Sequence, residues 1–164
     1  LTLKKNMNLI GYVKWSHYDK DGDGFTDKDS SYYKWINDEI ISLYAELFKQ
    51  GFVQTVECRI DEELVGGLYG ISLKGAFFGE SMFSRETDAS KIALIHLVAR
   101  LNEDGFSLLD TQFTTDHLIS LGAIEISRND YLAKLNKALL LESRFNPKGS
   151  EKSHEAFVSQ ILEE

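Results

Sequence analysis

Two polar side chains in the run LLDTQF could act on one reacting centre. Asp110 and Gln112 lie two positions apart in a segment that favours a β-strand, and such residues point to the same face of a strand. A carboxylate there could take up a proton, and an amide could orient a polar group of a substrate. The alternative, which spacing alone favours, is a strand-end Asp that caps the following turn.

An acidic run, DKDGDGFTD at residues 19–27, is a second candidate site. Its carboxylates fit positions 1, 3, 5 and 9 of an EF-hand-type calcium loop, and its central glycine fits position 6. The four candidate ligands are Asp19, Asp21, Asp23 and Asp27. Position 12, which requires a bidentate glutamate, is Ser30. A solvated acidic turn is therefore the simpler interpretation, and calcium binding remains the alternative.

The periodicity of apolar residues predicts the elements that position these groups. Helices are expected at 35–49, 88–103, 115–122 and 128–143, with a further one near 150–163. Strands are expected at 53–60, 64–72, 75–80, 106–113 and 123–127. We expect Thr87 or Asp88 to cap the second helix, and Gly51 and Gly105 to end the first and second helices. This order predicts a mixed α/β (α+β) fold.

Composition narrows the class of protein. The 164 residues carry a formal net charge of −8, which disfavours unassisted binding to a phosphate backbone and suits a cationic partner. A single cysteine, Cys58, cannot form an internal disulfide. No apolar run approaches the roughly 20 residues of a membrane span, and the N-terminus lacks the features of a signal peptide. We therefore expect a cytoplasmic monomer that does not associate with membranes.

Two long segments carry a resemblance to a known family. ELVGGLYGISLKGAFFGESMFSRETDASKIAL (63–94) and LLDTQFTTDHLISLGAIEISRNDYL (108–132) closely resemble the signature of the leucyl/phenylalanyl-tRNA–protein transferases. WINDEIISLYAELFKQGFVQTVE (35–57) looks like the family segment that opens with a Trp-Ile pair. The resemblance implies a GNAT-like (acetyltransferase-like) fold with a mostly antiparallel sheet and no required metal or organic cofactor.

The resemblance also implies an activity. The family transfers Leu, Phe or sometimes Met from aminoacyl-tRNA to the N-terminal Arg or Lys of a protein, which marks that protein for degradation by the N-degron route. Asp110, Gln112 and Glu80 match the family's catalytic positions, with Thr111 where the family often has cysteine. Paired carboxylates at Glu80 and Asp110 would form a receptor for the acceptor's guanidinium or ammonium group. A solvent-facing glutamate is the alternative for Glu80.

The family's donor pocket maps onto a set of apolar residues in this sequence. These are Leu68, Leu97 and Leu101, with Phe78 and Met82 as neighbours. The family often has aromatics at the last two mapped positions, so leucine there leaves the pocket apolar but changes its shape. Ser81 could donate a hydrogen bond nearby or simply form a turn. Without the resemblance, the apolar residues would be read as core.

Trp35 matches a family tryptophan that stacks near the terminal adenosine of the tRNA, and a helix-start contact is the alternative. We expect residues 1–34 to form an N-terminal segment packed on the main domain, and residues 35–164 to form the catalytic domain. The family's tRNA-gripping N-terminal domain has no clear counterpart ahead of residue 35. A GNAT-like peptide-binding or regulatory module without transfer activity, with calcium at the acidic run, is therefore the alternative function.

Overall fold

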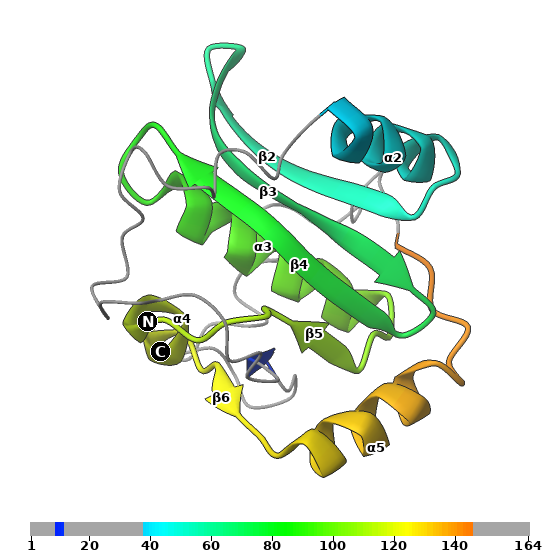
Figure 1. Ribbon diagram of the computed structural model, residues 1–164. Coiled ribbons are helices and arrows are strands. Elements are labelled where there is room, and N and C mark those ends of the chain that lie inside the picture. Colours follow the sequence, from blue (N-terminus) through cyan, green and yellow to red (C-terminus); the bar gives the residue numbers. More distant parts are fainter. Residues whose placement is uncertain (1–8, 12–37, 146–164) are drawn as a thin grey trace.

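The computed structural model describes residues 9–11 and 38–145 of the chain. In chain order the elements are β1 (Leu9–Gly11), α2 (Asp38–Lys49), β2 (Val53–Ile60), β3 (Glu63–Leu73), β4 (Ala76–Ser84), α3 (Ala89–Glu103), β5 (Leu108–Asp110), α4 (Asp116–Ser120), β6 (Ile124–Glu125) and α5 (Arg128–Ala138). One six-stranded sheet has the strand order β2-β3-β4-β5-β1-β6 (Figure 1). The mixed α/β, GNAT-like class is confirmed. The helix expected near 150–163 and the segment 1–8 lie outside the described residues.

Strands β2, β3 and β4 form two consecutive antiparallel hairpins. Asp61 and Glu62 join β2 to β3 with φ values of +46° and +70°, which is the conformation that tight two-residue hairpin turns require. Lys74, at φ +55°, starts the turn from β3 to β4. The predicted strand 53–60 is confirmed with its exact bounds, and β4 runs four residues further than the predicted 75–80, to Ser84.

The other half of the sheet is parallel and short. β5 pairs with β4 on one side and with β1 on the other, and β1 pairs with β6. The strand predicted over 106–113 is wrong in its extent, because only Leu108–Asp110 is strand. The chain leaves the sheet immediately afterwards, since Gln112 has φ +61° and extended backbone requires a negative φ.

Helix α3 covers one face of the sheet. Its inward side chains Leu94, Leu97, Val98 and Leu101 join Phe77 in the main hydrophobic core. Gly105, at φ +75°, follows its end as predicted. Asp88 occupies the N-cap position, as predicted, but its side chain makes no cap bond. Ser84 Oγ at the end of β4 instead accepts from the Ser90 amide at 3.0 Å.

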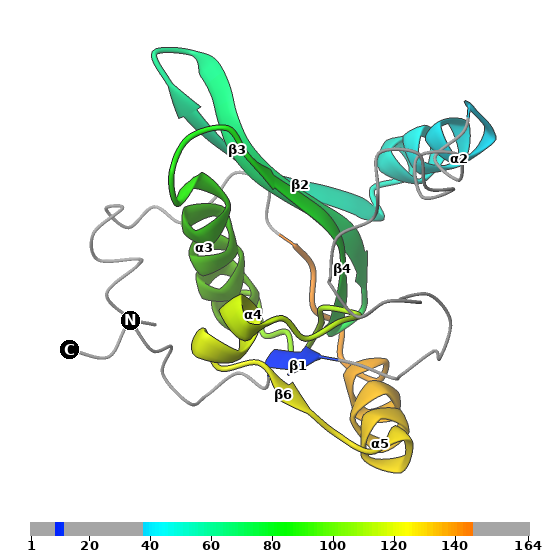
Figure 2. The same cartoon turned by 60° about the vertical axis from the view of Figure 1, so that its left-hand side comes forward.

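The remaining helices divide between the two faces of the sheet. Figure 2 shows α3 and α4 on one side, and α2 and α5 on the other. On the α5 side, a smaller core of Ala76, Leu108 and Ala138 packs against Phe78, Ile126, Tyr131 and Leu135. α5 ends at Ala138, five residues before the predicted end. α2 stands near the start of β2 and is followed by Gly51 at φ +83°, as predicted.

Candidate active site

The two halves of the sheet separate where β5 ends. β4 and β5 pair at Ala76, Phe77 and Phe78, which face Leu108, Leu109 and Asp110 in register. β4 then continues to Ser84, whereas the chain after Asp110 turns away. The backbone of β4 beyond Phe78 therefore has no strand partner on the β5 side among the described residues. A split of this kind exposes backbone groups and leaves room for a ligand.

A cavity of about 230 Å³ occupies this split, and we call it the split cavity. Its lining comes from β3, β4, α3, β5, α4 and the segment between β5 and α4. The apolar members are Leu68, Met82, Leu94, Leu97, Leu109, Phe113 and Leu118. The others are Tyr69, Gly79, Glu80, Ser81, Thr111, Thr115 and His117. An apolar cavity with a few polar groups is typical of a small-ligand site.

A β-bulge places Glu80 at this cavity. Tyr69 pairs with Ser81 and the next residue, Gly70, pairs with Gly79, so Glu80 is the extra residue of β4. A bulge re-aims the side chain of the extra residue and is often found next to active sites. The bulge explains why Glu80 lines the cavity together with both of its neighbours, Gly79 and Ser81.

Glu80 also contacts a helix on the other face of the sheet. Tyr44 of α2 hydrogen-bonds to the Glu80 side chain. Its ring meets the Tyr69 ring edge to face, with centroids 5.7 Å apart. Burial, followed by the charge and hydrogen bond of Glu80, raises the pKa of Tyr44 to about 12. Tyr44 therefore stays protonated and holds the carboxylate at neutral pH.

Asp110 is buried, with 8% of its surface exposed, and both of its carboxylate oxygens accept hydrogen bonds. Oδ1 accepts from the backbone amide of Gln112 at 2.8 Å, and Oδ2 accepts from the Tyr131 hydroxyl at 2.7 Å. The first of these bonds is the turn-capping alternative that spacing alone favoured. Neither Asp110 nor Gln112 is among the described residues that line the split cavity, whereas Thr111 and Phe113, on either side of Gln112, both line it.

Gln112 is held in a strained turn. The Phe113 amide donates to the Thr111 carbonyl at 2.7 Å across a three-residue turn, with Gln112 at its centre and φ +61°. The Gln112 side chain donates through Nε2 to the Gly79 carbonyl at 2.9 Å. Gly79 lies just beyond the last residue of β4 that pairs with β5, so the amide takes the place of a missing strand contact. Strained conformations of this kind gather at functional sites.

Comparison with known proteins gives the family. The family model described as leucyl/phenylalanyl-tRNA protein transferase matches residues 24–136. The chain is 59% identical to the leucyl/phenylalanyl-tRNA–protein transferase of Maricaulis maris over 112 residues, which are 68% of this chain and 52% of that protein. It is 62% identical over 105 residues to that of Rhizorhabdus wittichii, covering 64% of this chain and 42% of that protein. The chain belongs to the leucyl/phenylalanyl-tRNA–protein transferase family.

The match to the transferases leaves part of their length uncovered. The chain spans about half the length of the curated relatives it matches, and 58% of the related transferase of Gloeobacter violaceus, to which it is 55% identical over 111 residues. The matched region contains β2 to β6 and most of α5, and therefore every element that lines the split cavity.

Of the seven residues expected to bind substrate, four line the split cavity: Leu68, Ser81, Met82 and Leu97. Glu80, which was expected to be catalytic, lines it as well. Leu101 does not, because it is one α3 turn further on and is fully buried in the main core. Phe78 also does not, because its side chain packs on the opposite face against the smaller core. The apolar wall of the split cavity is therefore formed without these two side chains.

Other predicted site residues cannot be placed. Trp35 and the acidic run with Asp19, Asp21, Asp23 and Asp27 lie outside the described residues. Within the described ranges, no group of three or more His, Cys, Asp or Glu side chains is arranged to hold a metal ion. In the same ranges, no helix is long and apolar enough to cross a membrane.

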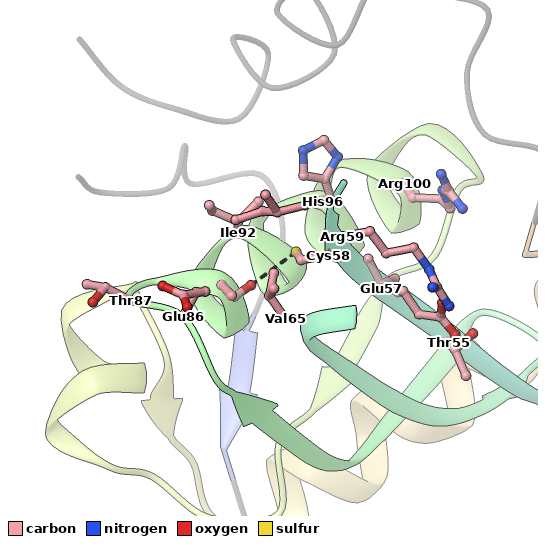
Figure 3. Close-up of a pocket in the computed structure, with 13 residues that line it drawn as sticks. Thr55, Glu57, Cys58, Arg59, Val65, Glu86, Thr87, Ile92, His96 and Arg100 are labelled. Carbon is pink, nitrogen blue, oxygen red and sulfur yellow. Dashed lines mark hydrogen bonds and ion pairs between the residues drawn. The ribbon is translucent and has the colours of Figure 1, made fainter. Parts of the chain in front are cut away.

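A larger cavity of about 740 Å³ lies between β2 and α3 (Figure 3), and we call it the outer cavity. Its lining mixes polar and apolar side chains and contains an ion pair between Glu57 and Arg59 with an N–O distance of 2.8 Å. Cys58 donates to the Ala89 carbonyl at 3.2 Å, and burial raises the pKa of this thiol, which keeps it a poor nucleophile. None of the predicted catalytic residues lines the outer cavity.

Tyr44 and Tyr131 were missed by the sequence reasoning. Tyr44 lies on the face of α2 shared with Ile40 and Leu47, so its helical spacing marks it as inward-facing but not as a partner of Glu80. Tyr131 carries no comparable signal, because the approach of α5 to β5 depends on the tertiary fold. Each tyrosine hydrogen-bonds to a carboxylate that the resemblance had singled out.

Proposed function

We propose that this protein transfers Leu or Phe, and also Met, from aminoacyl-tRNA to the N-terminal Arg or Lys of an acceptor protein, which marks the acceptor for N-degron degradation. The observation that carries the proposal is the split cavity, an apolar cavity bounded by Glu80 on one side and by the segment anchored through Gln112 on the other. The related proteins of Maricaulis maris and Rhizorhabdus wittichii are named as leucyl/phenylalanyl-tRNA–protein transferases, which supports the proposal.

The donor's side chain fits the chemistry of the split cavity. Leu68, Leu94 and Leu97 supply a wall that buries an apolar side chain and offers it few polar groups. Each buried methylene contributes about 0.8 kcal/mol, so Leu, Met and Phe gain more than Ala or Val. The cavity is therefore suited to recognising the amino acid, and the polar residues at its edge are suited to holding the ester.

The reaction needs orientation more than strong base catalysis. The α-amino group of the acceptor attacks the ester carbonyl, a C–N bond forms, and the C–O bond to the tRNA ribose breaks. The amine loses a proton and the leaving ribose oxygen gains one, so no cofactor is needed. An α-amino group has a pKa near 8 and is partly neutral under cellular conditions. Placing it correctly against the ester can supply most of the acceleration.

Gln112 and Asp110 have different roles in this proposal. Because the Gln112 amide is anchored through Nε2, its Oε1 is the atom available to accept a hydrogen bond from the attacking amine. Asp110 does not meet the substrate but holds the Gln112 turn through Oδ1. Glu80 attracts the cationic side chain of the acceptor's first residue. Of the two carboxylates, it alone is among the lining residues, which replaces a paired receptor by a single carboxylate.

The test is transfer of labelled Leu and Phe from charged tRNA onto a peptide that begins with Arg, with the same peptide beginning with Ala as the control. We expect transfer to the first peptide and much less to the second. A protein that binds charged tRNA but transfers nothing would contradict the proposal and favour a binding module.

A further inference from the structure

Tyr131 lies on α5, on the face of the sheet opposite the main core (Figure 2). Its ring packs against Ala76, Leu108 and Ala138 in the smaller core. This packing limits the positions that the ring can take, so the hydroxyl at its end is also fixed. An aromatic ring held in this way delivers one polar atom to a defined point without the entropy cost of a longer side chain.

That point is the Asp110 carboxylate. The Tyr131 hydroxyl donates to Oδ2 at 2.7 Å, while Oδ1 accepts from the Gln112 amide at 2.8 Å. Gln112 then donates through Nε2 to the Gly79 carbonyl at 2.9 Å. Four residues from α5, β5, the following turn and β4 are therefore joined in one chain of hydrogen bonds across the end of the strand pair.

The environments of Asp110 and of Tyr131 both stabilise the hydrogen bond between them. A carboxylate as buried as Asp110 loses its hydration and must be compensated by hydrogen bonds. Burial, followed by the hydrogen bond and charge of Asp110, raises the pKa of Tyr131, so the phenol remains a donor. If the hydroxyl were removed, Oδ2 would lose its donor and the carboxylate could rotate away from the Gln112 amide.

We propose that Tyr131 is a positioning residue for the transfer reaction, acting through Asp110 to hold the strained turn that presents Gln112. The inference rests on the proposed function for its effect on rate, but its effect on Gln112 is independent of any activity. A positive φ at a non-glycine residue is costly and persists only where its surroundings impose it. Tyr131 supplies part of that constraint from an element remote in sequence.

The variant Tyr131→Phe removes the hydroxyl and keeps the ring in the smaller core. We expect kcat for transfer to fall about 10-fold, with the KM for charged tRNA unchanged, because donor side-chain contacts in the split cavity remain. In an Asp110→Asn background the same change should have almost no effect on kcat, since Tyr131 acts only through Asp110. Equal effects in both backgrounds, or an unchanged kcat in the single variant, would overturn the inference.

The variant Ser127→Ala is the control for a general loss of α5 stability. It weakens the helix but leaves the Tyr131 hydroxyl in place. Ser127 Oγ caps α5 by accepting from the Asp130 amide at 3.1 Å, and it lies outside the hydrogen-bond chain. This variant should lower Tm while kcat stays within about twofold of wild type. A fall in kcat equal to that of Tyr131→Phe would mean that α5 stability, rather than the hydroxyl, matters, and the inference would be wrong.

A measurement that needs no transfer activity separates this inference from the proposed function. In wild-type protein, the Gln112 side-chain amide protons should exchange slowly by NMR, because Nε2 donates to Gly79. Tyr131→Phe should accelerate this exchange and Ser127→Ala should not. If this exchange pattern is observed but no transfer occurs, the proposed function is contradicted and the role of Tyr131 is not. Unaltered Gln112 exchange in folded Tyr131→Phe would overturn the role of Tyr131, whatever the activity of the protein.

Discussion

β2 and β3 share eight registered residue pairs, and so do β3 and β4, whereas β4 and β5 share three and β1 shares two with each neighbour. In the antiparallel half, backbone hydrogen bonds fix the strands. Where β5 ends, a side chain replaces the backbone hydrogen bond between strands: Gln112 Nε2 donates to the Gly79 carbonyl. The candidate site therefore lies where regular pairing stops, because the end of pairing there leaves backbone groups and space for a substrate.

Replacing Gln112, whose side chain takes the place of the missing strand contact, should have the largest effect on the rate of transfer. Gln112→Ala is expected to lower kcat for transfer about 100-fold and to leave donor binding within a few-fold, because the lost group acts on the amine in the transition state. Asp110→Asn should have a similar effect, and the double variant should be little worse than either, since the two residues act as a unit. Steady-state and binding assays check this, and additive losses would contradict it.

Substitutions in the antiparallel half of the sheet should lower the free energy of unfolding. A Cβ at Gly70 would lie 2.3 Å from the Phe78 carbonyl oxygen and 2.4 Å from the Phe77 ring, so Gly70→Ala should cost about 3 kcal/mol of unfolding free energy. The matched control is Gly79→Ala in the facing strand, where the nearest atom would be 3.4 Å away. Urea unfolding of both variants checks the contrast. Similar losses would mean that the two positions are equally packed.

Acceptor recognition should depend on the carboxylate at the bulge. Glu80→Gln is expected to reduce the preference for Arg-initiated over Ala-initiated peptides about 10-fold, because a charged partner is replaced by a neutral one of similar size. The control is Glu86→Gln, an exposed change at the outer cavity. The ratio of kcat/KM values for the two peptides is the measurement. A preference that survives in Glu80→Gln would place the receptor elsewhere.

Alkaline pH should weaken the contact between α2 and the bulge. The pKa of Tyr44 is raised to about 12, from a usual value near 10. The unfolded chain loses this proton at a lower pH than the folded protein, so the free energy of unfolding falls as pH rises from about 10 to about 12. Below about pH 10, the full contribution of Tyr44 to the free energy of unfolding is present. Tyr44→Phe should show a shallower fall in alkaline urea titrations, and an unchanged slope would contradict the contact.

The sequence predicted the antiparallel half well because its signals are local. Strand 53–60 follows from the alternation of its residues, and the end of α2 just before Gly51 follows from glycine's tolerance of positive φ. The site was only partly predictable. The spacing of Asp110 and Gln112 suggested one shared strand face, but the chain turns after Asp110, and the Gly79 carbonyl that holds Gln112 is 33 residues away in sequence. The residue type alone could not show that Phe78 packs against the smaller core on the opposite face of the sheet, or that Leu101 on α3 is buried in the main core.

The central claim is that the split cavity holds the side chain of the donor amino acid, and Met82→Ala tests it most directly. Met82 lines the cavity, whereas its neighbour Phe83 is similarly exposed on β4 and does not. Enlarging the cavity should raise the ratio of Phe to Leu transfer about fivefold in Met82→Ala, within the range that one or two methylenes can supply. Phe83→Ala should leave the ratio unchanged. The account is contradicted if the two variants change the ratio equally, or if neither changes it.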